Sequence, residues 1–186
     1  EFRLTSPKGQ FNEYVLGAFY MHGTSQETYQ RLSVNGGVAN SGRADYSTTN
    51  DSVALFGENT FNFTDDLRAI FGLRWTHDDL EYDHRRVSTS PTSVTGIQPS
   101  TASQGSVDED GWSGRTGLQY DFNDNLTGYV TYSRGYKGPA YNVFFNMQPR
   151  DTGALKPETS DAYEIGLKST ALDNRLGANL ALPTPA

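Results

Sequence analysis

The sequence has no cysteine, no strongly basic segment and no long hydrophobic run. Without cysteine the chain cannot form a disulfide framework or a thiolate metal site. A net charge of −7 and the absence of any Lys/Arg block exclude a basic surface for nucleic acid. No apolar stretch approaches the roughly 18 residues that a membrane-spanning helix needs. A soluble β-domain and a membrane β-barrel remain open, because a barrel leaves no such helical trace.

Aliphatic residues are sparse, whereas glycine and aromatic residues are common. The 186 residues include 19 glycines, 11 tyrosines and 10 phenylalanines but only 2 methionines. The apolar residues are spread over many short segments, and aromatic residues favour strands. This composition predicts an all-β protein.

Tight turn signals alternate with long polar stretches. Clusters of Gly, Pro, Asn and Asp predict four tight turns, at residues 6–9, 64–66, 123–125 and 172–174. Three stretches rich in Gly, Ser, Thr, Asn and Pro are predicted as long loops, at about residues 23–50, 88–107 and 137–158. The remaining segments predict eight strands, near residues 1–6, 11–22, 51–63, 66–87, 107–122, 125–136, 159–170 and 174–182.

Most of these strands carry apolar side chains on one face only. Strand 66–87 sets Leu67, Phe71 and Trp75 against Arg68 and Arg74, because successive side chains point to opposite faces. Strands 107–122, 159–170 and 174–182 repeat this pattern, and strand 125–136 does so less cleanly. Strands 11–22 and 51–63 carry apolar residues on both faces and cannot be oriented from the pattern.

The apolar stretches last about the 9 to 11 residues of a tilted transmembrane strand, and aromatic residues mark their ends. Trp75 and Trp112 mark one rim, and Phe63, Tyr120 and Phe122 mark the other. Short turns at one end and long loops at the other are also typical of outer-membrane barrels. We therefore predict an antiparallel up-and-down meander of about eight strands that forms part of a transmembrane β-barrel.

Residues 129–169 resemble the signature stretch of TonB-dependent outer-membrane receptors. They include YVTYSRGYKGPAYN and LKPETSDAYEIGLKS, in which an aromatic-Ser-Arg-Gly-aromatic-Lys phrase precedes a Lys-Pro-Glu-Thr phrase. The matching residues are Tyr132, Ser133, Arg134, Gly135, Tyr136, Lys137, Leu155, Lys156, Pro157, Glu158, Thr159, Tyr163, Glu164, Gly166 and Lys168. Looser similarity over residues 1–20, 61–78 and 114–133 extends the match over nearly the whole chain, in family order.

The resemblance implies a 22-stranded barrel in the outer membrane of a Gram-negative bacterium. Such a receptor takes up a scarce ligand, such as a ferric siderophore or cobalamin. The implied partners are outer-membrane lipid, a plug domain, the TonB energy-coupling protein and a small extracellular ligand. Eight strands are too few for that wall, so residues 1–182 are predicted to be a middle segment of the barrel from which the plug domain is absent.

The last residues depart from the family pattern. Pro183 and Pro185 cannot donate hydrogen bonds to a neighbouring strand. Residues 183–186 are therefore predicted to form a tail outside the strands.

The apolar face of strand 66–87 turns acidic beyond Trp75. The residues that continue this face are His77, Asp79, Glu81 and Asp83. With Trp75 level with Trp112, the next strand adds Asp108 and Asp110 nearby. These carboxylates could share divalent cations with phosphorylated lipid headgroups. The simpler interpretation is a solvated rim that stops the strand sliding into lipid, and charge runs favour it.

Other candidate residues carry weaker signals. His77 and His84 are seven residues apart and so lie on opposite strand faces, which argues against a shared metal. Arg74 and Arg115 lie on the polar face, where contact with the plug is the favoured interpretation over steering of an anionic ligand. Segment 108–111 lacks the later ligands of a calcium loop.

Extracellular ligand contacts are expected on the loops, where aromatic and Arg residues also serve in packing. The candidates are Tyr29, Arg31, Tyr46, Arg85, Arg86, Tyr141, Phe144, Phe145 and Arg150. None is promoted to a site, and the ligand-binding residues stay unknown. No catalytic, cofactor-binding or metal-ligating set can be assembled, so neither an enzyme nor a cofactor is predicted.

Two alternatives stay open. A self-contained eight-stranded outer-membrane barrel with a structural or adhesive role would pair its last strand with its first. A soluble β-barrel or sandwich that binds a small ligand would bury its apolar faces in a compact centre.

The acidic rim is testable by calcium titration of the folded parent protein. Replacing Asp79 and Glu81 (D79N/E81Q) is expected to leave the calcium response unchanged, because a solvated rim shares no cation. A calcium response that disappears in the variant would instead establish the cation site.

Overall fold

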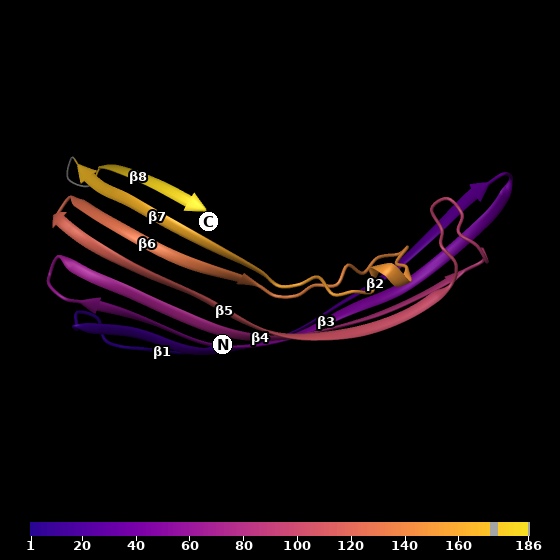
Figure 1. Cartoon of the computed structure of the whole chain (residues 1–186), viewed down its shortest axis with the longest axis horizontal. Helices are drawn as coiled ribbons and strands as arrows, with labels where there is room; N and C mark the ends of the chain where they lie inside the picture. Colours follow the sequence, from indigo (N-terminus) through magenta and orange to yellow (C-terminus); the bar gives the residue numbers. More distant parts are fainter. Residues whose placement is uncertain (172–174, 186) are drawn as a thin grey trace.

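A computed structural model shows the chain as one long, curved antiparallel sheet (Figure 1). It describes residues 1–171 and 175–185, so the turn predicted at 172–174 and Ala186 lie outside the described residues. The strands are β1 (Phe2–Thr5), β2 (Asn12–Asn35), β3 (Val38–Asn62), β4 (Leu67–Ser88), β5 (Thr101–Asn123), β6 (Leu126–Lys137), β7 (Glu158–Ala171) and β8 (Leu176–Pro185). A short 3-10 helix, η1 (Pro149–Asp151), lies between β6 and β7.

The eight strands form an up-and-down meander, as predicted. Each strand pairs antiparallel with its neighbour in sequence, in the order β1 to β8. Over the described residues β8 does not pair with β1, so the sheet stays open at both edges. This is the arrangement of a wall segment, and it contradicts the alternative of a closed eight-stranded barrel.

The middle strands are much longer than a membrane requires. β4 has 22 residues, which at about 3.3 Å per residue is roughly 70 Å, twice the span of a tilted transmembrane strand. β2, β3 and β5 are similarly long, whereas β1, β6, β7 and β8 stay at the end where the tight turns lie (Figure 1). Half of the sheet therefore extends beyond any membrane-spanning band.

The prediction of a long loop at residues 23–50 is wrong. β2 and β3 pair continuously from Asn12 and Phe61 to Asn35 and Val38. Gly36 and Gly37 form the turn with φ of 57° and 79°, the backbone that a two-residue hairpin turn requires. The segment resembled a loop because both faces of this ribbon are polar. The Asn-Gly-Gly turn signal was present in the sequence but lay inside that polar stretch.

The other two loops are closer to expectation. β5 begins at Thr101, which shortens the predicted loop at 88–107 to residues 89–100. The segment at 137–158 is a loop apart from η1.

The predicted non-strand tail is also wrong for residues 183–185. β8 runs to Pro185, with Pro183 opposite Glu164 and Pro185 opposite Ala162. The two prolines are two residues apart, so the positions of their missing N–H groups lie on the same side of the strand. Over the described residues β8 pairs with β7 alone, so it is an edge strand of this sheet, a position where proline is tolerated.

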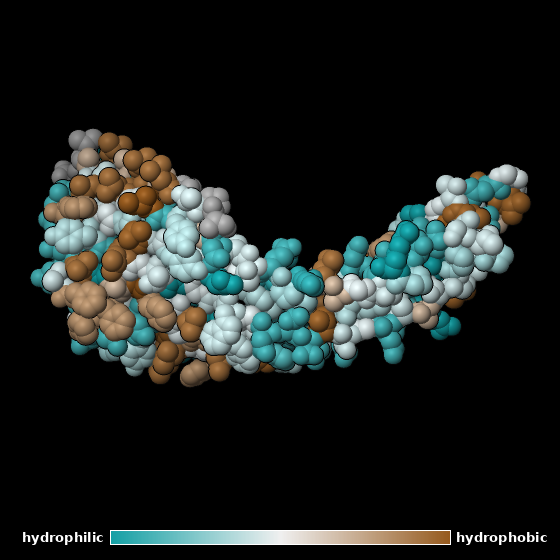
Figure 2. Space-filling view, in the orientation of Figure 1, coloured by the Kyte–Doolittle hydropathy of each residue, from teal (hydrophilic) through white to brown (hydrophobic). Residues whose placement is uncertain are grey.

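The outward face is defined by Leu67, Phe71 and Trp75, and its apolar side chains are not buried in a core. Phe71, Leu118 and Ile165 are 53%, 52% and 59% exposed. Figure 2 shows hydrophobic residues gathered at the end of the molecule that carries β6 to β8, and hydrophilic residues over the long extension. The apolar surface is therefore a band at the turn end of the sheet, as a lipid-facing wall requires and a soluble domain does not.

Aromatic side chains mark both rims of this band, as predicted. Trp75 lies directly opposite Trp112 in the pairing of β4 with β5. At the turn end, the rings of Tyr120 and Phe122 are 5.1 Å apart in an edge-to-face arrangement. Phe63 lies at the same end and is exposed. Together these residues bound the stretch that faces the hydrocarbon.

The inner face of the same band carries charged side chains, one in an ion pair and one over aromatic rings. Arg115 donates two hydrogen bonds to Glu58, at 2.7 and 2.8 Å. Arg74 lies over the rings of Phe19 and Phe56 at 5.2 and 5.7 Å.

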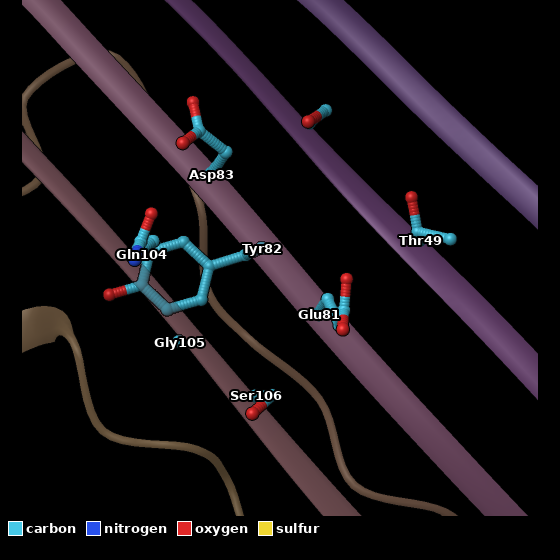
Figure 3. Close-up of a pocket in the computed structure, with 8 residues that line it drawn as sticks. Thr49, Glu81, Tyr82, Asp83, Gln104, Gly105 and Ser106 are labelled. Carbon is cyan, nitrogen blue, oxygen red and sulfur yellow. The ribbon is translucent and has the colours of Figure 1, made fainter.

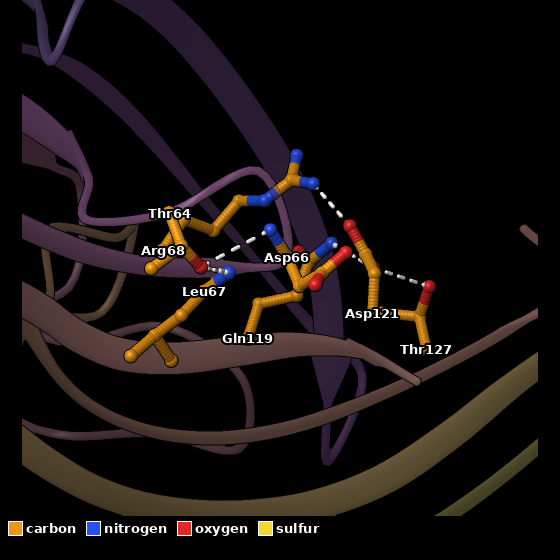
Figure 4. Close-up of polar contacts among 7 residues, drawn as sticks. All are labelled: Thr64, Asp66, Leu67, Arg68, Gln119, Asp121 and Thr127. Carbon is orange, nitrogen blue, oxygen red and sulfur yellow. Dashed lines mark hydrogen bonds and ion pairs between the residues drawn. The ribbon is translucent and has the colours of Figure 1, made fainter. Parts of the chain in front are cut away.

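A second polar network ties the turn ends together (Figure 4). Arg68 bonds to Asp121, which also accepts the Thr127 hydroxyl at 2.7 Å. The Thr64 hydroxyl accepts the Leu67 N–H at 2.9 Å and so closes the turn between β3 and β4. The inner face thus combines charged and hydroxyl side chains with the rings of Phe19 and Phe56.

Gly111 and Gly23 give a matched test of packing on the inner face. A Cβ at Gly111 would lie 2.2 Å from the Tyr136 ring, whereas one at Gly23 would meet nothing within 4 Å. We expect G111A to lower the free energy of unfolding of the intact receptor by about 1–3 kcal/mol, because the ring must move. G23A should change it by less than about 0.5 kcal/mol. Urea unfolding measures both, and equal losses would contradict the packing.

Candidate functional site

A long loop crosses the inner face of the sheet at its extended end. We call residues 138–157, between β6 and β7, the strap. β6 stops pairing with β5 at Arg134 and Gly114, although β5 continues to Thr101. The chain therefore leaves the wall, crosses the inner face towards β2 and β3, and returns to begin β7 (Figure 1).

The strap explains a strict alternation of burial along the upper half of β4. From Thr76 to Val87 the even-numbered residues are buried, and the odd-numbered ones are exposed except for the half-buried His77. The buried residues are Thr76, Asp78, Leu80, Tyr82, His84 and Arg86. Because alternate side chains point to opposite faces, only the face beneath the strap is covered.

Aromatic side chains near and on the strap pack where the strands carry glycine. The Tyr136 ring, at the end of β6, lies over Gly111, and the Phe145 ring lies 2.9 Å from the position of a Cβ at Gly42. Tyr141 contacts Tyr82, with ring centroids 4.5 Å apart. Glycine allows this close approach because it has no side chain to displace.

The far end of the strap forms a small core with the loop between β4 and β5. Ile97 and Met147 are fully buried, and Phe145 packs 5.1 Å from the Tyr29 ring. Arg31 lies 5.2 Å from the Phe145 ring and donates to the Gly96 carbonyl at 2.9 Å. The same carbonyl accepts the Asn146 side chain at 3.1 Å. Two loops and the β2–β3 hairpin are thereby joined.

Arg86 is the polar centre of this core. It is 3% exposed, and its guanidinium donates to the carbonyls of Pro99 at 2.9 Å, Phe145 at 2.7 Å and Met147 at 3.0 Å. Burial lowers the pKa of the guanidinium below its usual value, yet arginine stays cationic in proteins. Carbonyl dipoles of both loops therefore take the place of a carboxylate partner.

His84 lies one inner-face position from Arg86. It is 1% exposed and stacks on Tyr46 with ring centroids 5.9 Å apart. Neither ring nitrogen has a hydrogen-bond partner. Burial and the nearby Arg86 charge lower the pKa of His84 below its usual value, so the ring is neutral at neutral pH.

Tyr136 and Asp78 lie where β6 leaves the wall. Burial, followed by the negative charge of Asp78, raises the pKa of Tyr136 to about 12. A Cβ at Gly138 would lie 2.5 Å from the Asp78 carboxylate, so the strap begins in close contact with β4. The motif residue Tyr136 thus packs the base of the strap.

Most of the nine loop candidates meet in this region. Tyr29, Arg31, Arg86 and Phe145 are joined as described above. Tyr46 stacks on His84 and Tyr141 on Tyr82, while Phe144 is half-buried and accepts the Met147 N–H at 3.1 Å. Arg85 lies on the outward face and Arg150 is exposed on η1. Sequence reasoning missed His84, Ile97, Asn146 and Met147, although the parity of β4 placed His84 and Arg86 on one face.

The acidic rim forms on the outward face, as predicted. Asp79 lies opposite Asp108 on one side and Asp51 on the other. Asp110 accepts the Trp75 indole N–H at 3.1 Å and lies 3.1 Å from the His77 ring. His77 and His84 face opposite sides of β4, as expected. Over the described ranges no group of three or more His, Asp or Glu residues could hold a metal ion.

A shallow polar groove of about 490 Å³ includes Glu81 and Asp83 of this rim (Figure 3). It is lined by Ser47, Thr49, Glu81, Tyr82, Asp83, Gln104, Gly105 and Ser106. These residues come from β3, β4 and β5, and their hydrophilic character fits a surface beyond the hydrocarbon.

The described part of the chain holds no helix that is long and apolar enough to cross a membrane.

A family model described as TonB dependent receptor-like, beta-barrel matches residues 2–182. The chain belongs to this family. Its members are β-barrel receptors of the Gram-negative outer membrane. The strands of this segment are therefore barrel strands, and their apolar outward band faces lipid.

Two of the relatives are siderophore receptors by name. The ferric-pyoverdine 358 receptor of Pseudomonas putida is 28% identical over 137 residues, which are 74% of this chain and 15% of that receptor. The catecholate siderophore receptor Fiu of Escherichia coli is 26% identical over 160 residues, 79% of this chain and 21% of Fiu. The chain thus spans about a fifth or less of these two receptors.

The fold agrees with a solved barrel. The ferric yersiniabactin uptake receptor FyuA from Yersinia pestis superimposes with a TM-score of 0.77 at 18% identity. The match covers 97% of this chain and 27% of FyuA. A barrel wall segment of this family has the long curved meander seen here.

Phe145 should anchor the strap of the receptor. F145A removes a buried ring and should release residues 138–157, because Phe→Ala in a core costs about 3–5 kcal/mol. Limited proteolysis of the intact receptor should then cut within the strap. L155A removes an exposed side chain from the same loop and is the control. Equal resistance of F145A and the unmodified receptor would contradict the anchor.

Proposed function

We propose that the chain is a wall segment of an outer-membrane receptor that takes up a ferric siderophore. The names of its relatives carry this proposal: they are receptors for ferric pyoverdine and for catecholate siderophores, and the structural match is a ferric yersiniabactin receptor. The geometry is compatible, because a lipid-facing band and an elaborate extension with a loop core occupy opposite ends of the sheet. The extension is then the extracellular end.

The inner face supports a filled lumen. Arg74 and Arg115 point inward at the level of the lipid band, and a groove of about 650 Å³ lies along them, lined in part by Arg3, Phe56 and Glu58. In this family a plug domain fills the barrel and TonB supplies the energy, and we propose both as partners of the whole receptor. Contact with the plug, rather than with the ligand, is the proposed role of these arginines.

The extracellular end supplies the ligand contacts in this proposal. Tyr29, Arg31 and Phe145 are engaged in holding the strap, so the strap itself presents the surface that a ligand meets. Arg150 on η1 is 77% exposed at its side chain, and Lys156 is exposed near the end of the strap. These cations suit a ferric complex with net negative charge.

Uptake of radiolabelled iron tests the proposal. Cells with and without the receptor gene would be given ferric pyoverdine, a ferric catecholate or ferric yersiniabactin. We expect one complex to enter only when both the receptor and TonB are present. R150E/K156E should raise the half-saturating concentration of that complex, with charge-preserving R150K/K156R as the control.

Two outcomes would count against it. Iron uptake from all three complexes that is unaffected by loss of the receptor would reject ferric siderophores as the ligand. Receptor-dependent uptake of cobalamin in the same cells would show that the ligand is cobalamin and not a ferric siderophore.

A further inference from the structure

One buried cation, Arg86, and one buried neutral ring, His84, lie beneath the strap on the same face of β4. Arg86 reaches across the interface with three hydrogen bonds to backbone carbonyls, two of which belong to the strap. His84 lies beside it with both nitrogens unpartnered. While the strap is docked, Arg86 carries the single positive charge of this buried site, and His84 is neutral.

We propose that His84 and Arg86 form a proton-sensitive latch that holds the strap against the inner face at neutral pH and releases it in acid. A second positive charge on His84 would lie beside Arg86 in a site closed to water. Burying an unpaired charge is costly, and a like charge nearby adds to the cost. Release of the strap exposes the His84 ring to water and removes both costs.

Burial and the Arg86 charge lower the pKa of His84, and they outweigh the strap backbone at Phe144 and Phe145 and the Asp83 carboxylate, which raise it. Arg86 on β4 is the nearest cation. Tyr46 on β3 is neutral, and its hydroxyl donates to Glu27 of β2 at 2.8 Å. Asp83 is the neighbouring carboxylate on β4, but it points to the outward face and is exposed. β5 places the uncharged Ser103 opposite His84, and the strap presents the backbone of Phe144 and Phe145.

The sign of the pH effect follows from the lowered pKa of His84 in the docked state. Above the usual histidine pKa of about 6.5, both states are neutral at this ring and the latch holds. Below a pH of about 6.5, His84 binds a proton when the strap is released but not when the strap is docked. The ratio of released to docked strap then rises by up to about tenfold per pH unit, until the docked ring itself is protonated.

Release would alter the extracellular mouth of the receptor. Tyr82, Tyr29 and Phe145 would lose their cover, and the loop at residues 89–100 would lose its bond from Arg86 to Pro99. The latch goes beyond the proposed uptake of a siderophore, because the docking of the strap can be measured without any ligand.

Hydrogen exchange of the intact receptor in outer-membrane vesicles tests the latch. Peptides that cover residues 138–157 would be followed at pH 7.5 and pH 5.5, after correction for the intrinsic exchange rate. We expect protection of the strap to fall about tenfold in acid, while β4–β5 pairs within the lipid band keep theirs. H84Q and H84F should keep the strap protected at both pH values, and H84F retains the stack on Tyr46.

The three histidines of the chain supply the control. The H22Q/H77Q variant leaves His84 as the only histidine of the chain and should keep the full acid response, because His22 and His77 lie on the outward face beside Asp51 and Asp110. R86K keeps the charge but loses the planar fork of donors, so it should weaken protection at both pH values.

The proposal is overturned if protection of the strap in the unmodified receptor is the same at both pH values. It is equally overturned if H84Q or H84F retains the acid response, or if H22Q/H77Q loses it. None of these results depends on which ligand the receptor carries.

Discussion

Strand pairing with a two-residue side-chain period governs every other feature of this protein. A backbone in lipid must satisfy its hydrogen bonds internally, and a paired sheet does so while sending alternate side chains to opposite faces. β4 shows the consequence within one strand. Its first nine residues set Phe71 and Leu73 against lipid and Arg74 against the lumen. Its later residues use the same alternation to set Asp79 in water and His84 beneath the strap.

The extended half of the sheet needs a core of its own, because no lipid covers it. The strap supplies that core by crossing the inner face, and it uses few groups to do so. Aromatic rings pack against glycines, and Arg86 binds carbonyls that would otherwise be buried without a donor. A carboxylate partner is unnecessary because three carbonyl dipoles surround the cation. The same compact arrangement makes the neighbouring His84 sensitive to any change of charge.

Sequence reasoning succeeded where a local pattern had one physical meaning. The alternation of strand 66–87 and the aromatic rims predicted the lipid-facing band. The pairing of β4 with β5 confirmed that Trp75 and Trp112 lie at the same height in the sheet. The prediction failed where the polar composition of a long stretch was given more weight than a short turn motif within it. The polar composition of the ribbon around Gly36 predicts a loop, although Asn-Gly-Gly is a hairpin signal. Pro183 and Pro185 are tolerated because β8 is an edge strand of this sheet. Whether a strand lies at an edge depends on its neighbours in space, so the two prolines alone do not reveal it.

By itself the sequence determined the class of structure: antiparallel strands with one apolar face, aromatic rims and the phrases of a receptor family. These properties are local, because each depends on residues a few positions apart. Only the tertiary structure decided which side chains from distant segments meet. Arg86, Gly42 and Phe145 are far apart along the chain, and their contact depends on the path by which the strap leaves the wall at Arg134. That path follows from the packing of a whole face, which no short stretch of sequence encodes.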